Sequence, residues 1–71
     1  MRDIIISKEP IELYKILKFE GMVASGGAAK FAIANGQVLV NGTVETQKRK
    51  KILSNDVVKF GDESIRVRLQ S

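Results

Sequence analysis

The stretch SGGAAKFAIANGQVLVNG, residues 25–42, decides the fold, because it holds both ends of a helix and the turn of a hairpin. Ser25 is a favourable N-cap residue, and Asn35-Gly36 is typical of a helix end, where glycine readily adopts a left-handed conformation. The alanines between them make a thin helix that can approach a neighbouring element closely. We therefore predict a second helix of the chain over residues 25–36.

After this helix the apolar pattern changes from helical to alternating. Val38 and Val40 are two positions apart and are followed by Asn41-Gly42. This dipeptide is the strongest short signal for a β-hairpin, because both residues accept a positive φ. The pattern predicts a strand, a tight turn and a returning strand.

Other short strands are predicted on both sides of this centre, at DIIIS, KIL, VVKF and SIRVRL. The first of them, residues 3–7, is expected to pair with the last. In SIRVRL the apolar residues alternate with arginines, so Ile65, Val67 and Leu69 should face the core. Turns are expected at Ser54–Asp56 and at Gly61–Glu63.

A first helix is predicted between the N-terminal strand and Ser25. Ser7 is a possible cap, Pro10 suits an early helical position, and Gly21 supplies a left-handed stop. One face of this helix is apolar, formed by Leu13, Ile16 and Leu17. Three aromatic residues, Phe19, Phe31 and Phe60, are expected in the core.

The composition indicates one small soluble domain, residues 1–71. An apolar fraction of 44% and a charged fraction of 28% are typical of a folded chain. The absence of cysteine excludes a disulfide framework and fits a reducing compartment. The longest apolar run is Ile4 to Ile6, too short for a membrane span. We expect a cytoplasmic protein, without a membrane partner, that acts as a monomer.

The excess positive charge of the chain lies in one block, Lys48-Arg49-Lys50-Lys51. The net charge is +4, and the pI near 9.7 favours an acidic partner. In one regular strand with Ile52 inward, Lys48 and Lys50 would point into the core at a cost of several kcal/mol each. The block is therefore expected in a loop or an irregular edge. Two interpretations remain open, a phosphate-binding site and a solvated loop.

The longer stretch from residue 25 to residue 58 resembles the S-four RNA-binding domain, named after a protein of the small ribosomal subunit. In that family a serine opens a helix that ends at a glycine before Val-x-Val-Asn-Gly. The matching positions are Ser25, Ala29, Ala32-Ile33, Gly36 and Val38-Leu39-Val40-Asn41-Gly42. Asp56-Val57-Val58 resembles the closing Gly-Asp-x-Val turn, with Asn55 in place of glycine. The length and the Ser-Gly-Gly start are similar to the short stand-alone bacterial members.

This resemblance implies an α+β fold, in which an L-shaped helix pair packs on a small, strongly bent, mostly antiparallel sheet of about five short strands. It also implies binding of structured RNA, such as ribosomal RNA or its precursors, along the helix pair and the adjoining loops. The residues expected at this surface are Lys15, Lys18, Ser25, Gly26, Gly27, Lys30, Gln47, Lys48, Arg49, Lys50 and Lys51. Of these, Lys30 is expected on the exposed side of its helix.

One position departs from the family pattern. Many members have arginine directly after the serine, where this chain has Gly26, so that RNA contact does not carry over. Bare N–H groups at Gly26 and Gly27 would suit a phosphate at a helix N-terminus. Alternatively, the glycines permit a tight turn between helices. Lys15 and Lys18 could likewise form an ordinary solvated face, and Tyr14 or Phe19 could stack on unpaired bases.

Catalysis is not expected. Without histidine or cysteine, the chain can assemble neither a nucleophile–base pair nor a soft metal site, and its carboxylates are scattered at helix ends and turns. We expect no cofactor. Besides RNA binding, two functions stay open: a protein-interaction adaptor on the ribosome or another assembly, and a binder of DNA as well as RNA.

Overall fold

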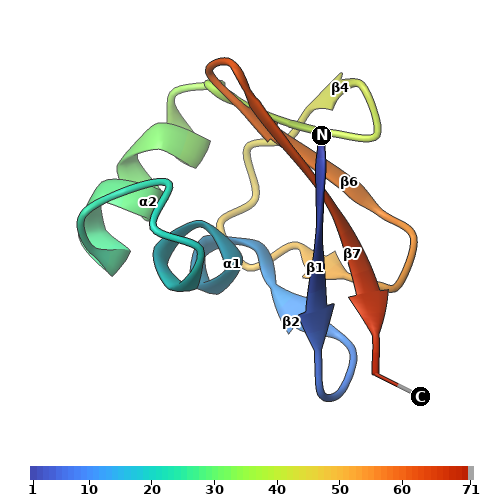
Figure 1. Ribbon diagram of the computed structural model, residues 1–71. Helices are drawn as coiled ribbons and strands as arrows, with labels where there is room; N and C mark the ends of the chain where they lie inside the picture. Colours follow the sequence, from blue (N-terminus) through green and yellow to red (C-terminus); the bar gives the residue numbers. More distant parts are fainter. Residues whose placement is uncertain (71) are drawn as a thin grey trace.

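A computed structural model describes residues 1–70 of the chain (Figure 1). Seven strands and two helices follow one another in sequence. Their bounds are β1 Arg2–Ile6, β2 Ile11–Glu12, α1 Leu13–Phe19, α2 Gly26–Ala34, β3 Val38–Val40, β4 Thr43–Val44, β5 Lys51–Ile52, β6 Val57–Phe60 and β7 Glu63–Leu69. In these residues no helix is long and apolar enough to cross a membrane.

The strands form two sheets. The larger sheet has five strands in the order β1-β7-β6-β3-β4, and β2 pairs with β5 in a small separate sheet. β1 runs parallel to β7, and every other neighbouring pair is antiparallel. Figure 1 shows α1 and α2 beside each other on one side of the larger sheet. The predicted α+β fold and the pairing of the first strand with the last are thus confirmed.

The helix predicted from residue 25 is confirmed at both ends. The Ser25 hydroxyl accepts a hydrogen bond from the Ala28 N–H at 3.1 Å, which makes Ser25 the N-cap of α2. Gly36 has a φ of +74°, the left-handed conformation expected after the helix end. α2 buries Ala29, Ala32 and Ile33.

The hairpin between β3 and β4 turns at Asn41-Gly42, whose φ angles of +52° and +84° are those of a primed turn. Asn41 also links this turn to β6. Its amide donates to Asp56 Oδ1 at 3.0 Å, and its Oδ1 accepts from the Val57 N–H at 2.9 Å. Asn55, with a φ of +78°, takes the left-handed position that glycine has in the family pattern.

Replacing Gly42 with valine should destabilise the protein by about 1 kcal/mol or more, because a β-branched residue is strained at positive φ. No atom lies within 4 Å of a Cβ built at Gly42, so the effect comes from the backbone alone. Thermal unfolding should show a melting temperature lower by about 4–8 °C. The exposed neighbour Thr43 provides a control, Thr43→Val, that should leave it unchanged. If the Gly42→Val variant had the melting temperature of the parent, the result would contradict the primed turn.

The start of the first helix differs from the prediction. Ser7 is not its cap and Pro10 is not helical; α1 begins at Leu13, with Glu12 at the N-cap position and no side-chain cap. The physical reason is a non-local pairing, since Ile11 and Glu12 are held in β2 opposite Ile52 and Lys51 of β5. The predicted stop is confirmed, because Gly21 has a φ of +70°.

The core lies between the helix pair and the sheet. Its fully buried members include Leu13, Ile16, Leu17, Ile33, Val38, Ile52, Val58, Ile65 and Val67. The expectation that Phe19 and Phe31 pack there is wrong, since they are 64% and 66% exposed, because each lies on a face of its helix away from the core. Phe60 packs against the core and is half-buried. Leu69, expected inward, is exposed at the end of β7.

Candidate nucleic-acid interface

The basic block lies after β4, ends at the first residue of β5 and is exposed throughout. Gln47 and Lys50 close a turn, in which the Lys50 N–H donates to the Gln47 carbonyl at 3.1 Å. Lys51 is the only block residue in a strand, and Ile52 after it is fully buried. The prediction of a loop or irregular edge is confirmed: the block turns its cations outward while its last residue leads into the core.

The main chain of the block is bonded to the start of α1. The Leu13 N–H donates to the Lys50 carbonyl at 2.9 Å, and the Tyr14 N–H donates to the Lys48 carbonyl at 3.1 Å. These two N–H groups belong to the first turn of the helix and have no partner within it. The loop therefore replaces a side-chain cap, which explains why Glu12 needs none. As a result, the block is held beside α1.

Glu12 lies among the cations of this region. Its carboxylate forms two ion pairs, with Lys15 Nζ 3.2 Å from Oε1 and Arg49 Nε 3.7 Å from Oε2. Lys51 is its cross-strand neighbour in the β2–β5 pair. One carboxylate thus joins α1 to the block. Sequence reasoning missed this role, although the three-residue spacing of Glu12 and Lys15 is a recognisable helix-pair signal.

Tyr14 connects α1 to α2. Lys30 Nζ lies 4.7 Å from the centre of the Tyr14 ring, a cation–π distance. Both side chains are half-buried, and Tyr14 also packs against the core. The expectation that Lys30 lies on the exposed side of α2 is therefore wrong, because the ring draws its side chain toward the neighbouring helix.

The N-terminus of α2 lies close to Lys18 of α1. A Cβ built at Gly26 would meet Lys18 Cδ at 3.9 Å, and one at Gly27 would meet Ser25 Oγ at 3.8 Å. Both are ordinary contacts, and neither glycine has a positive φ. A larger residue would therefore fit at either position, and packing does not explain the two glycines. No acceptor for the Gly26 or Gly27 N–H is found in residues 1–70.

The predicted surface thus falls into three linked parts. The block meets α1 through main-chain bonds and Glu12, α1 meets α2 through Tyr14 and Lys30, and Lys18 lies beside Gly26. Gln47 is tied to its own segment, where its N–H donates to Glu45 Oε2 at 3.1 Å. Within the described part of the chain, no cluster of three or more carboxylates could hold a metal ion. The arrangement places cationic side chains from both helices and the block along the helix pair.

Comparison with known proteins gives consistent matches. The family model described as S4 domain, the S-four family of the sequence resemblance, matches residues 4–68. YbcJ of Escherichia coli is 49% identical over 63 residues, which cover 87% of this chain and 90% of YbcJ. A Bacillus subtilis protein named as a probable ribosome maturation protein, RlbA, is 36% identical over 55 residues, 78% of either chain.

A solved structure has the same fold. The solution structure of E. coli YbcJ superimposes with a TM-score of 0.72 at 46% identity, over 93% of this chain and 85% of that one. That structure is described as revealing an αL motif involved in RNA binding. At this identity and coverage, the likeness extends to the arrangement of the helix pair on the sheet.

Proposed function

The chain belongs to the S4 domain family, and from this we propose that it is a non-catalytic protein that binds structured RNA, ribosomal RNA or its precursors. The proposed contacts are made by a basic surface comprising Lys15, Lys18, Ser25–Gly27, Lys30 and Gln47–Lys51. In this proposal residues 1–71 act as one cytoplasmic, monomeric binding module.

One observation carries the proposal: the block is bonded to α1 through the carbonyls of Lys48 and Lys50. Its four cations account for the whole excess charge of the chain, and one of them, Arg49, shares the Glu12 carboxylate with Lys15 of the helix. A loop fixed in this way loses little further freedom when it binds, in contrast to a freely moving basic segment. This supports a phosphate-binding site over a solvated loop.

The second part of the surface suits a phosphate through its backbone. The N–H groups of Gly26 and Gly27 open α2, where the helix dipole favours negative charge. Lys18 lies beside this end, and Lys30 follows on the next turn of α2. Contacts of this kind position a nucleic acid without reading its bases, so we expect recognition of shape and phosphates more than of sequence.

The ribosomal part of the proposal comes from the relatives. RlbA carries ribosome maturation in its name, and the structure of YbcJ is described by an RNA-binding motif. Ribosomal RNA and its precursors are rich in the structured, looped segments that such a surface would recognise.

RNA binding can be tested by fluorescence anisotropy with hairpins taken from ribosomal RNA, at a series of salt concentrations. We expect binding whose affinity falls steeply with salt, since each phosphate contact releases counterions. Duplex DNA of matching sequence should bind more weakly. Co-sedimentation with ribosomal precursor particles would test the ribosomal part separately. Absence of RNA binding at low salt, or an affinity insensitive to salt, would refute the proposal.

A further inference from the structure

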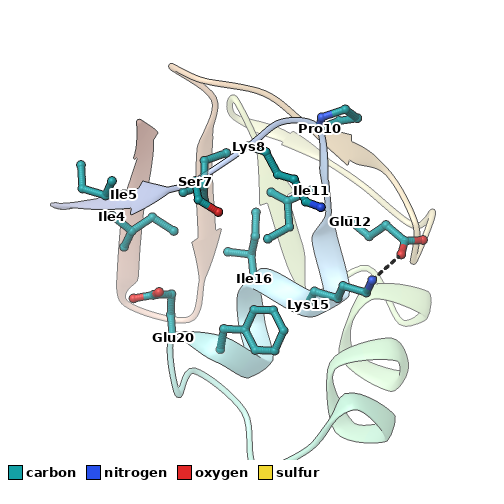
Figure 2. Close-up of a pocket in the computed structure, with 12 residues that line it drawn as sticks. Ile4, Ile5, Ser7, Lys8, Pro10, Ile11, Glu12, Lys15, Ile16 and Glu20 are labelled. Atoms are coloured by element: carbon teal, nitrogen blue, oxygen red, sulfur yellow. Dashed lines mark ion pairs between the residues drawn. The ribbon is translucent and has the colours of Figure 1, made fainter. Parts of the chain in front are cut away.

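A groove of about 540 Å³ runs between β1, the segment after it and α1 (Figure 2). Its size is within the range of small-ligand sites in proteins. The groove exists because β1 is an edge strand of the larger sheet and α1 passes beside it. Of the residues expected at the basic surface, only Lys15 lines it, together with Phe19, which the sequence left open as a base-stacking residue.

The wall of this β1–α1 groove is apolar and open to solvent. Phe19, which is 64% exposed, lines it with half-buried Ile11 and buried Ile16, whereas the side chain of Ile5 points to the other face of β1 (Figure 2). An exposed apolar residue on a convex surface is ordinary, but a large ring beside further apolar side chains in a concave site points to a ligand or partner. The ring of Phe19 offers a flat surface on which a planar group could stack.

Carboxylates lie at both ends of the groove, and Ser7 and Lys8 lie between them (Figure 2). Figure 2 shows Glu12 and Lys15 at one end, joined by their ion pair, and Glu20 at the other, below Ile4. Glu20 Oε1 faces Arg2 at 3.4 Å, and Oε2 has no partner in residues 1–70. An unpartnered carboxylate oxygen can accept a hydrogen bond from an N–H donor.

We propose that the β1–α1 groove receives one unpaired base of the bound RNA, with Phe19 as the stacking residue. A nucleobase combines flat apolar faces with polar edges, and the groove offers an aromatic wall with a carboxylate acceptor at its end. The inference rests on the proposed function, because RNA must first bind the basic surface. It adds a preference for RNA with a bulged or looped nucleotide.

The groove is continuous with the basic surface through two side chains. Lys15 and Glu12 line the groove, and the same Glu12 carboxylate holds Arg49 of the block. A phosphate on Lys15 or Arg49 would therefore put the next nucleotide at the mouth of the groove. The exposed ammonium of Lys8, which also lines the groove and has no ion pair in residues 1–70, adds positive charge there.

The decisive experiment compares two RNA hairpins that differ only by one bulged adenosine. The parent protein should bind the bulged hairpin more tightly, and Phe19→Ala should reduce this preference by about tenfold or more, as for loss of a stacking contact. Phe31→Ala is the matched control, since Phe31 is equally exposed but lies on α2 outside the groove. It should leave the preference unchanged, and both variants should keep the parent melting temperature.

Nuclear magnetic resonance locates the base directly. The bulged hairpin should shift the methyl signals of Ile11 and Ile16, which line the groove, through the ring current of the base, and the unbulged hairpin should not. Tight binding of both hairpins with unmoved methyl signals would overturn the groove proposal while leaving RNA binding intact. If neither hairpin binds, the proposed function itself fails. If an alternating valine-threonine peptide moves these signals and the bulged RNA does not, the groove is a peptide site on the edge of β1.

Discussion

Replacing Ala32 with leucine is expected to destabilise the protein by about 1–3 kcal/mol, because the larger side chain overpacks a close contact. Ala32 is 4% exposed, on the face of α2 that also carries buried Ala29 and Ile33. For a domain of this size, each kcal/mol lowers the melting temperature by about 4–8 °C. Calorimetry or thermal circular dichroism would measure it.

The matched control is Ala34→Leu on the same helix. Ala34 is exposed, and leucine is nearly as good a helix former as alanine, so the control should be close to neutral. Ala32→Leu should also weaken RNA binding, because a displaced α2 separates Lys30 from Tyr14 and Gly26 from Lys18. A melting temperature equal to that of the parent would show that the helices have room between them.

The centre of the fold was predictable because its signals are local. A serine cap needs only the N–H three residues ahead, and an Asn-Gly turn needs only two residues that accept positive φ. Neither depends on where the rest of the chain lies. The same holds for Gly21, whose left-handed stop was read from the end of one apolar pattern.

The start of α1 was not predictable, because its determinant is distant in sequence. Pro10 suits the first turn of a helix in isolation, yet Ile11 and Glu12 pair with β5, some forty residues further along the chain. The N–H groups of Leu13 and Tyr14 then bond to the block. A capping pattern cannot reveal a cap supplied by a loop.

The wrong prediction for two phenylalanines has a different cause, namely that residue type does not show which face of a helix is buried. Phe19 and Phe31 were assigned to the core on residue type alone. In α2 the small residues Ala29 and Ala32 take the buried face, and Phe31 lies opposite them. In α1 the buried face belongs to Leu13, Ile16 and Leu17. The groove beside Phe19 was therefore invisible until the two sides of the helix were known.

For the candidate site, the sequence supplied the cations but not their connections. The charge block and the lysines of both helices are visible in the sequence, since four cations in a row stand out against a balanced background. The three-residue spacing of Glu12 and Lys15 is a local signal, but nothing local indicates that Glu12 also holds Arg49, or that Tyr14 holds Lys30. These contacts unite separate charges into one surface.

Changing Lys48, Arg49, Lys50 and Lys51 together to glutamine is expected to lower RNA affinity by about two orders of magnitude near physiological salt. If each cation neutralises one phosphate of looped RNA, the slope of log affinity against log salt should flatten by about 0.7 per contact, roughly 3 in all. The fold should survive, because the block is bonded to α1 through the carbonyls of Lys48 and Lys50, which the substitutions leave in place.

A second fourfold variant separates the position of the charge from its amount. Arg2, Lys59, Arg66 and Arg68 lie on β1, β6 and β7, and their change to glutamine removes the same charge from the sheet. It also removes the ion pairs of Arg2 and Arg68, which are exposed and worth about 0–1 kcal/mol each. If RNA contacts the block itself, the slope of log affinity against log salt should flatten strongly in the block variant and little in the sheet variant. Equal flattening of the slope in both variants would mean that RNA responds to net charge alone.

A folded block variant with unchanged affinity and slope would show that the block is a solvated loop. Lys15, Lys18 and Lys30 would then remain as the cationic contacts.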